Sequence, residues 1–64
     1  MFKELEILAA QAGFRFAEAI KVGEEWHVIL NAEDGEMSYK GATVQEAVEK
    51  ATENLVRILN RHDR

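Results

Sequence analysis

The 64-residue sequence predicts an α+β domain in the order α-β-β-β-α, a three-stranded antiparallel meander with two helices packed on one face. Apolar residues recur at helical spacing near both ends of the chain, which predicts the two helices. Between them lie three short segments rich in β-branched and aromatic residues, and four glycines separate the pieces. Residues 1–64 leave room for a single domain, since so short a chain buries only roughly 60% of the surface that its unfolded form exposes.

The first predicted helix is short and amphipathic. Its apolar stripe consists of Phe2, Leu5, Leu8, Ala9 and Ala12. Gly13 follows where a left-handed residue would end the helix. Ile7 lies outside the stripe, so we expect its side chain to be exposed.

The middle of the chain predicts strands over Phe14–Val22, Glu25–Asn31 and Glu36–Lys40. A turn over Ala32–Gly35 joins the second strand to the third. Its length sets the register by placing Leu30 opposite Met37, Val28 opposite Tyr39, and Trp26 near Gly41. All the large apolar groups of this hairpin then share one face.

The first hairpin has more than one possible register, because a shift of one residue turns every side chain of a strand over. A three-residue loop at Val22–Glu24 places Phe16 and Ile20 in the core but also directs Glu18 inward, which is costly for a lone carboxylate. A two-residue Gly23–Glu24 loop instead places alanines under the helices. The opposite face then carries Phe16, Glu18, Ile20, His27 and Ile29. A β-bulge near Glu18 is a third solution.

The last helix has the clearest start in the sequence. Thr43 is the predicted N-cap, with its hydroxyl accepting from the Glu46 N–H while the Glu46 carboxylate accepts from the Thr43 N–H in a capping box. The helix is expected to run to about Asn60. Its apolar stripe consists of Val44, Ala47, Val48, Ala51, Leu55, Ile58 and Leu59.

Composition restricts the classes of function. Twelve acidic residues against eight Lys and Arg give a formal charge of −4, which disfavours a protein whose affinity comes mainly from neutralising phosphates. The chain contains no Cys, so neither disulfides nor thiolate metal sites are expected. Without a basic and apolar leader or a long apolar run, the expected location is the cytoplasm, with no membrane association.

No set of residues predicts catalysis, a metal site or a cofactor. Ser38 is the single serine and has no nucleophile motif around it, and His27 and His62 lack metal-ligand spacing. The acids Glu33, Asp34 and Glu36 flank a turn without the longer pattern of a calcium loop. We therefore expect a protein that is not an enzyme and takes no cofactor.

The order of elements resembles that of the double-stranded RNA-binding domain over nearly the whole chain. In that family the first helix, the loop between the first two strands and lysines at the start of the last helix contact RNA. The resemblance implies contacts at the loop Gly23–Glu25 and the helix start Thr43–Val48. It supports an alternative hypothesis of nucleic-acid binding by the basic side chains of the chain, which include Lys3, Lys40, Lys50 and the terminal arginines.

The second half of the chain resembles a different family. The segment Trp26–Leu30, the Asp34–Gly35 turn and the segment Gly41–Leu55 look like the partial RNase H-like domain of HicB-type antitoxins. The last helix of those domains often opens with the pattern Gly-x-Thr-x-x-Glu-Ala, which Gly41–Ala47 matches. This resemblance implies that the chain binds another protein.

The predicted binding surface is the sheet face without helices. With Trp26, Val28 and Leu30 directed inward, the opposite face receives the candidate partner-binding residues Phe16, Ile20, His27 and Ile29. The competing interpretation is a solvated sheet face with one stray Ile.

The leading hypothesis is a small interaction module of a phage or mobile bacterial element. It would act as a homodimer or by binding a partner protein. Besides nucleic-acid binding, a third hypothesis is an acidic inhibitor of a nuclease or defence protein, which would present its carboxylates as a phosphate mimic.

Overall fold

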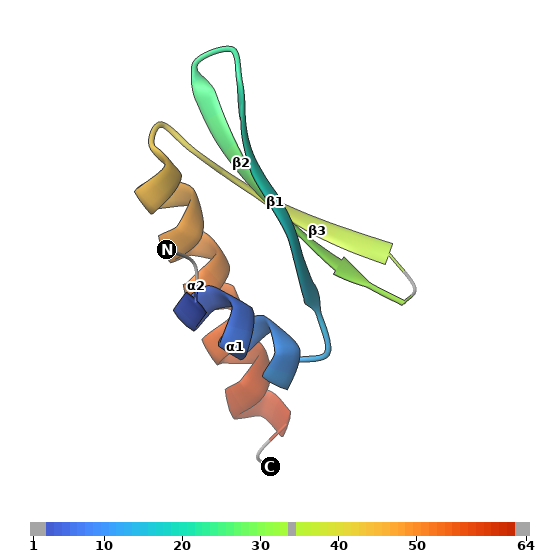
Figure 1. Ribbon diagram of the computed structural model, residues 1–64. Coiled ribbons are helices and arrows are strands. Elements are labelled where there is room, and N and C mark those ends of the chain that lie inside the picture. The colour runs from blue at the N-terminus through green and yellow to red at the C-terminus, as the bar shows by residue number, and fades with distance from the viewer. Residues whose placement is uncertain (1–2, 34, 63–64) are drawn as a thin grey trace.

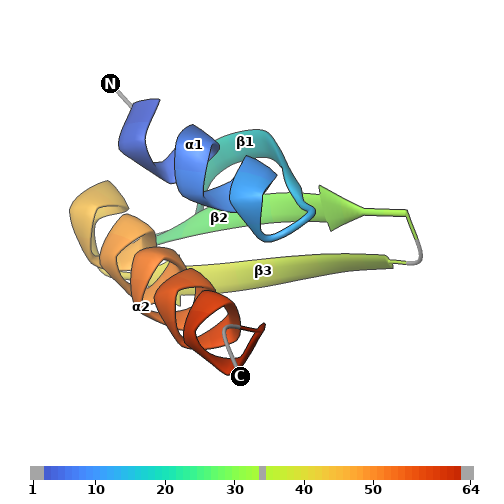
Figure 2. The same cartoon turned by 90° about the horizontal axis from the view of Figure 1, so that it is seen from below.

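The computed structural model describes residues 3–33 and 35–62, apart from the side chains of Phe16, Ala17 and His62, and has the predicted α-β-β-β-α order (Figure 1). The elements are α1 (Lys3–Gln11), β1 (Arg15–Val22), β2 (Glu25–Ala32), β3 (Gly35–Gly41) and α2 (Val44–His62). The antiparallel sheet has the order β1-β2-β3, and both helices lie on one side of it (Figure 2). Phe2 of the predicted stripe and Asp34 of the predicted turn lie outside the described residues.

Helix α1 ends as its sequence predicts. Gly13 has a φ of 87° and donates its N–H to the Ala10 carbonyl, while the Phe14 N–H reaches the Ala9 carbonyl at 2.7 Å. These two bonds form a Schellman motif, which satisfies carbonyls that the end of the helix would otherwise leave free. The motif turns the chain back so that Phe14 packs against the core at the entrance to β1.

The predicted register of the second hairpin is confirmed. Leu30 pairs with Met37, Val28 with Tyr39, and Trp26 with Gly41. Val28 and Leu30 are fully buried, so the burial of large apolar groups on one face was sufficient to fix this pairing.

The first hairpin combines two of the solutions that the sequence left open. Val22 pairs with Glu25, which leaves Gly23 and Glu24 as a two-residue loop, and a bulge interrupts the pairing between Phe16 and Glu18. The three-residue loop is therefore wrong. Glu18 lies opposite Ile29 and is exposed, so the carboxylate avoids the core.

The core lies between the sheet and the two helices. Its fully buried members are Leu5, Ala9, Val28, Leu30, Ala47, Ala51 and Leu55. The small alanines of both helices allow close packing against each other and against the sheet. Ile7 is 51% exposed, as expected from its position outside the α1 stripe.

A hydrogen bond between layers ties α2 to β3. The Asn54 side-chain amide donates to the Tyr39 hydroxyl at 2.6 Å, and that hydroxyl lies 3.7 Å from the Met37 sulfur. Tyr39 can therefore pack its ring against the core while its polar end keeps a partner.

The start of α2 is capped, with one difference from the expectation. The Glu46 N–H donates to the Thr43 hydroxyl at 3.1 Å, but the Glu46 carboxylate accepts from the Ala42 N–H at 3.3 Å rather than from Thr43. The Glu46 side chain lies over Gly41, which brings its carboxylate to the amide that follows the glycine. The same carboxylate is 3.7 Å from the Lys50 ammonium.

Gly41 allows α2 to begin directly beside the end of β3. A Cβ at this position would lie 2.7 Å from the Ala47 nitrogen and 2.8 Å from the Glu46 Cβ. Both distances are too short for real atoms, and the first contact is with backbone. Only glycine therefore permits this approach of strand and helix.

Among the described residues, neither helix has the length and apolar character needed to cross a membrane.

Replacing Gly41 with Ala should lower the free energy of unfolding by about 1–3 kcal/mol, because the new methyl group forces the α2 backbone away from β3. Urea unfolding followed by circular dichroism measures this change. Ala42→Ser at the exposed neighbouring position is the control and should change stability by less than about 0.5 kcal/mol. Equal stability of Gly41→Ala and wild type would contradict the tight junction.

Replacing Thr43 with Ala should cost about 1 kcal/mol, because the Glu46 N–H loses its acceptor. Thr43→Ser keeps the hydroxyl and should recover most of that loss. Thermal unfolding of both variants measures the loss of stability, and the difference between them gives the contribution of the hydroxyl cap. Equal destabilisation by Ser and Ala would show that the hydroxyl does not cap α2.

Candidate functional site

Both helices of the described part of the chain lie on the same face of the sheet (Figures 1 and 2), and we call the other face the open face. Strand alternation and the two registers assign the following described residues to it: Arg15, Glu18, Ile20, Val22, Glu25, His27, Ile29, Asn31, Glu36, Ser38 and Lys40. The helices cover only the opposite face, on which Val28 and Leu30 are buried (Figures 1 and 2).

The centre of the open face is apolar. Ile20 pairs with His27, and Ile29 lies one row further along β2, opposite Glu18. Ile20, His27 and Ile29 are all half-buried, although neither described helix lies on this face (Figure 2). Val22 extends the group toward the first turn and is 54% exposed. We call Ile20, Val22, His27 and Ile29 the apolar patch.

The structure places three of the four predicted partner-binding residues together. Ile20, His27 and Ile29 lie on neighbouring strands in adjacent rows. Phe16 lies beyond the bulge, where its backbone pairs with Leu30 rather than with a residue of the open face. Its side chain lies outside the described part of the chain.

Val22 belongs to the patch but was not among the predicted site residues. The signal was present in the sequence, because Val22 is two residues from Ile20 and therefore shares its face. Val22 belongs to the turn in the three-residue loop alternative, whereas the observed two-residue loop makes it the last residue of β1.

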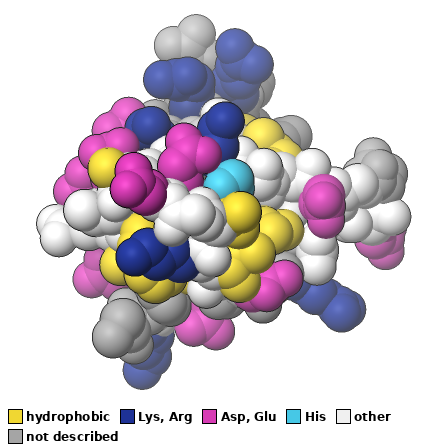
Figure 3. All heavy atoms as spheres, turned by 90° about the horizontal axis from the view of Figure 1, so that it is seen from above, with side chains coloured by type: hydrophobic (Ala, Val, Ile, Leu, Met, Phe, Trp, Pro, Cys, Tyr) yellow, Lys and Arg dark blue, Asp and Glu magenta, His cyan; other side chains and the backbone are white. Residues whose placement is uncertain are grey.

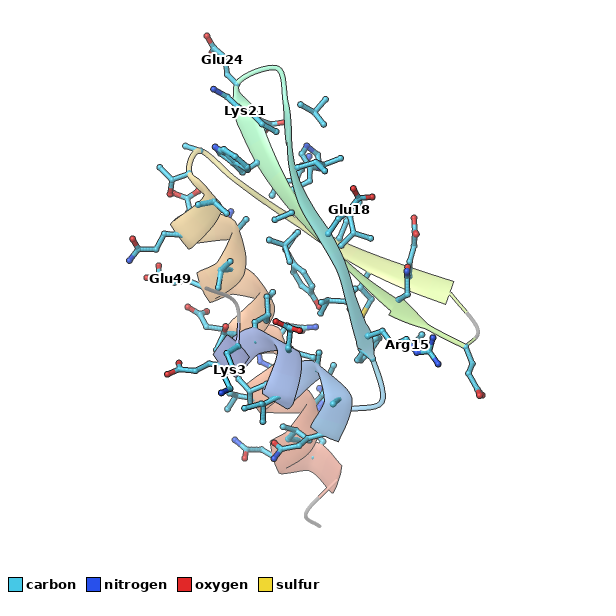
Figure 4. All side chains as sticks on the ribbon, viewed as in Figure 1. Lys3, Arg15, Glu18, Lys21, Glu24 and Glu49 are labelled. Carbon is cyan, nitrogen blue, oxygen red and sulfur yellow. The ribbon has the colours of Figure 1, made fainter. Side chains whose placement is uncertain are left out.

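Charged groups surround the patch. Glu25 lies beside Val22 at the first turn, Glu18 lies opposite Ile29 at the other end of the patch, and Lys40 lies opposite His27 on β3; all three are exposed. The His27 Nε2 lies 3.9 Å from the Glu25 carboxylate, a pair that carries opposite charges only when His27 is protonated. Figure 3 shows the histidine side chain beside hydrophobic side chains, with acidic and basic groups around them. Figure 4 shows Glu18 directed away from both helices.

The described residues contain no cluster of three or more His, Cys, Asp or Glu side chains that could hold a metal ion. Ser38 is exposed on β3 opposite Ile29, an apolar neighbour that cannot act as a base. A hollow between the end of α1 and the end of β2 is lined by Arg15, Asn31 and Glu33 together with alanines, Gly13 and Phe14. None of these side chains is a nucleophile with a neighbouring general base. That the chain is not an enzyme stays a prediction.

The positions implied by the resemblance to RNA-binding domains have acidic character. At the start of α2 the Glu46 carboxylate accepts from the Ala42 N–H and also pairs with the Lys50 ammonium. Glu24 stands at the tip of the first hairpin, near Lys21 (Figure 4). The lysine at the start of α2 is therefore paired with a carboxylate, and the first turn carries an exposed acid where a phosphate contact would need a positive charge.

Comparison with known proteins gives no assignment: no family model, no curated protein and no solved structure matches the chain.

Proposed function

We propose that the chain is a non-catalytic interaction module that binds a partner protein through the apolar patch of the open face. The observation that carries the proposal is the grouping of Ile20, His27 and Ile29 on the sheet face opposite the two described helices. Apolar side chains gathered in this way lose contact with water when a partner covers them, which favours association.

The surroundings of the patch support a protein partner. An apolar centre with a charged rim is the usual arrangement of a protein interface. Here Glu18, Glu25 and Lys40 form that rim and supply both signs of charge. Charges of both signs can orient a partner, whereas a surface that binds nucleic acid needs a predominance of positive charge.

The distribution of basic groups gives less support to the nucleic-acid alternative. Lys3 is on α1, Arg15 and Lys21 are at opposite ends of β1, and Lys50 pairs with Glu46 (Figure 4). With a formal charge of −4 for the whole chain, the field around the molecule opposes the approach of phosphates. The acidic-inhibitor alternative would need a concentration of carboxylates, and on the open face Lys40 interrupts the acidic groups.

Replacing both Ile20 and Ile29 with Lys should abolish partner binding and leave the fold intact. Lysine places a charge in the centre of the interface, and in the free protein its long side chain can reach water from the open face. The measurement is affinity capture from the source cells with immobilised wild-type and variant chains, followed by circular dichroism to verify folding.

The matched control is the double variant Ile7→Lys, Val56→Lys. These two side chains are 51% and 41% exposed on the helices, so the variant adds the same charge to other apolar surface. The expected partners are proteins that bind both wild type and this control but do not bind the Ile20→Lys, Ile29→Lys variant. If all three chains capture the same proteins, binding through the patch is contradicted. Tight binding of duplex RNA that weakens steeply with salt would favour the nucleic-acid-binding alternative.

A further inference from the structure

Strand β3 is an edge strand whose sequence is complementary to itself. The sheet order leaves β1 and β3 with one unpaired side each. A bulge interrupts β1 between Phe16 and Glu18, and bulges of this kind hinder edge pairing. In contrast, β3 pairs regularly with β2 over all seven residues, Gly35–Gly41. Its half next to the second turn lies clear of both helices in Figure 2.

The backbone groups of β3 that are available for pairing can be assigned from the hairpin. Ala32 pairs with Gly35 around a two-residue loop, and the pair that closes such a loop shares backbone hydrogen bonds. Hydrogen-bonded and non-bonded pairs alternate along antiparallel strands. Counted from Gly35, the backbone groups of Glu36, Ser38 and Lys40 therefore point away from β2. The side chains of these same residues are exposed on the open face.

The residues of β3 are arranged symmetrically around Ser38. Gly35 corresponds to Gly41, Glu36 to Lys40, and Met37 to Tyr39. An antiparallel copy centred on Ser38 would bring Glu36 opposite Lys40 of the partner subunit, and Lys40 opposite the partner's Glu36. Oppositely charged cross-strand pairs stabilise a sheet, and like charges directly opposite destabilise it.

Other registers are less favourable. Centring on Glu36 places two carboxylates opposite each other, and centring on Lys40 places two ammonium groups opposite each other. Both also shorten the overlap of the available backbone groups. Only the register centred on Ser38 pairs all of Glu36, Ser38 and Lys40 with available backbone groups of the second copy.

The helix-covered side of β3 is compatible with the same register. Met37 and Tyr39 are half-buried there, so each retains some surface that a neighbouring strand could cover. The register would place Met37 beside Tyr39 of the partner subunit, and contacts between sulfur and aromatic rings are favourable.

We propose that two copies of this chain associate by antiparallel pairing of their β3 edges around Ser38, which joins their sheets into one continuous sheet. The partner is a second copy, and the recognition elements are the backbone groups of β3 and the two Glu36–Lys40 cross-pairs. A chain this short gains stability from such association, since its own core is small. This inference is independent of the proposed function, which rests on the apolar patch.

The test uses charge reversal at the two paired positions. Glu36→Lys places lysines opposite the partner's Lys40, and Lys40→Glu places carboxylates opposite the partner's Glu36. Each variant alone should dimerise at least about tenfold more weakly than wild type. An equimolar mixture of the two should recover a heterodimer, because all cross-strand pairs are again of opposite charge.

Sedimentation equilibrium of the full chain measures the association. Wild type should approach a mass of about 14.6 kDa, twice the 7.3 kDa of one chain, as concentration rises. Glu49→Lys on α2 and Lys21→Glu at the first hairpin make the same changes of net charge away from the β3 edge, and both should dimerise like wild type. Circular dichroism verifies that every variant is folded.

Either of two kinds of result would overturn the proposal: no association of the wild type, or association that does not depend on the Glu36–Lys40 cross-pairs. One is a wild-type chain that remains a monomer at millimolar concentration. The other is a dimer whose affinity is equal in wild type and both single variants, or a mixture that fails to restore association. If the Ile20→Lys, Ile29→Lys variant dimerises normally while losing its partner protein, the edge and the patch are separate surfaces.

Discussion

The close approach of β3 and α2 at Gly41 is the constraint on which the remaining architecture depends. The absence of a side chain lets the Ala47 backbone lie against the end of the strand, and the Thr43 cap begins the helix immediately afterwards. With so short a connection, α2 must return over the sheet it has just left. That places Ala47, Ala51 and Leu55 in one core with Val28 and Leu30, on the face of the sheet that α1 also covers (Figure 2).

How far the sequence predicts this structure depends on the size of the side chains in each element. In the second hairpin, Trp26, Val28 and Leu30 alternate with smaller or polar groups, so one register buries them all and the prediction is confirmed. In β1, Ala17 and Ala19 contribute too little apolar area to outweigh Phe16 and Ile20. The alternation of side chains in β1 therefore favours no single register. The bulge between Phe16 and Glu18 shifts the pairing, so that Phe16 pairs with Leu30 while Glu18 and Ile20 pair with residues of the open face.

The sequence likewise predicts the positions of some residues of the candidate site and not of others. His27 and Ile29 were placed correctly because β2 has a fixed register, whereas Phe16, Ile20 and Val22 depended on the first hairpin. The capping box shows a finer limit. Sequence spacing identifies Thr43 and Glu46, but the choice between the Thr43 and Ala42 amides depends on how the Glu46 side chain lies over Gly41. That contact between strand end and helix start is visible only in three dimensions.

The two proposed surfaces meet along β3, and their relation has a functional consequence. Pairing of the β3 edges would leave both open faces on the same side of one sheet, since a two-fold axis at Ser38 perpendicular to the sheet preserves its sides. Each apolar patch lies on β1 and β2, away from that axis, so a dimer would present two patches to one partner or to two copies of it. Two weak contacts joined in this way bind far more tightly than one, because the second contact forms at high effective concentration. A dimer would therefore bind a partner that offers two contact sites more tightly than a single copy of the patch.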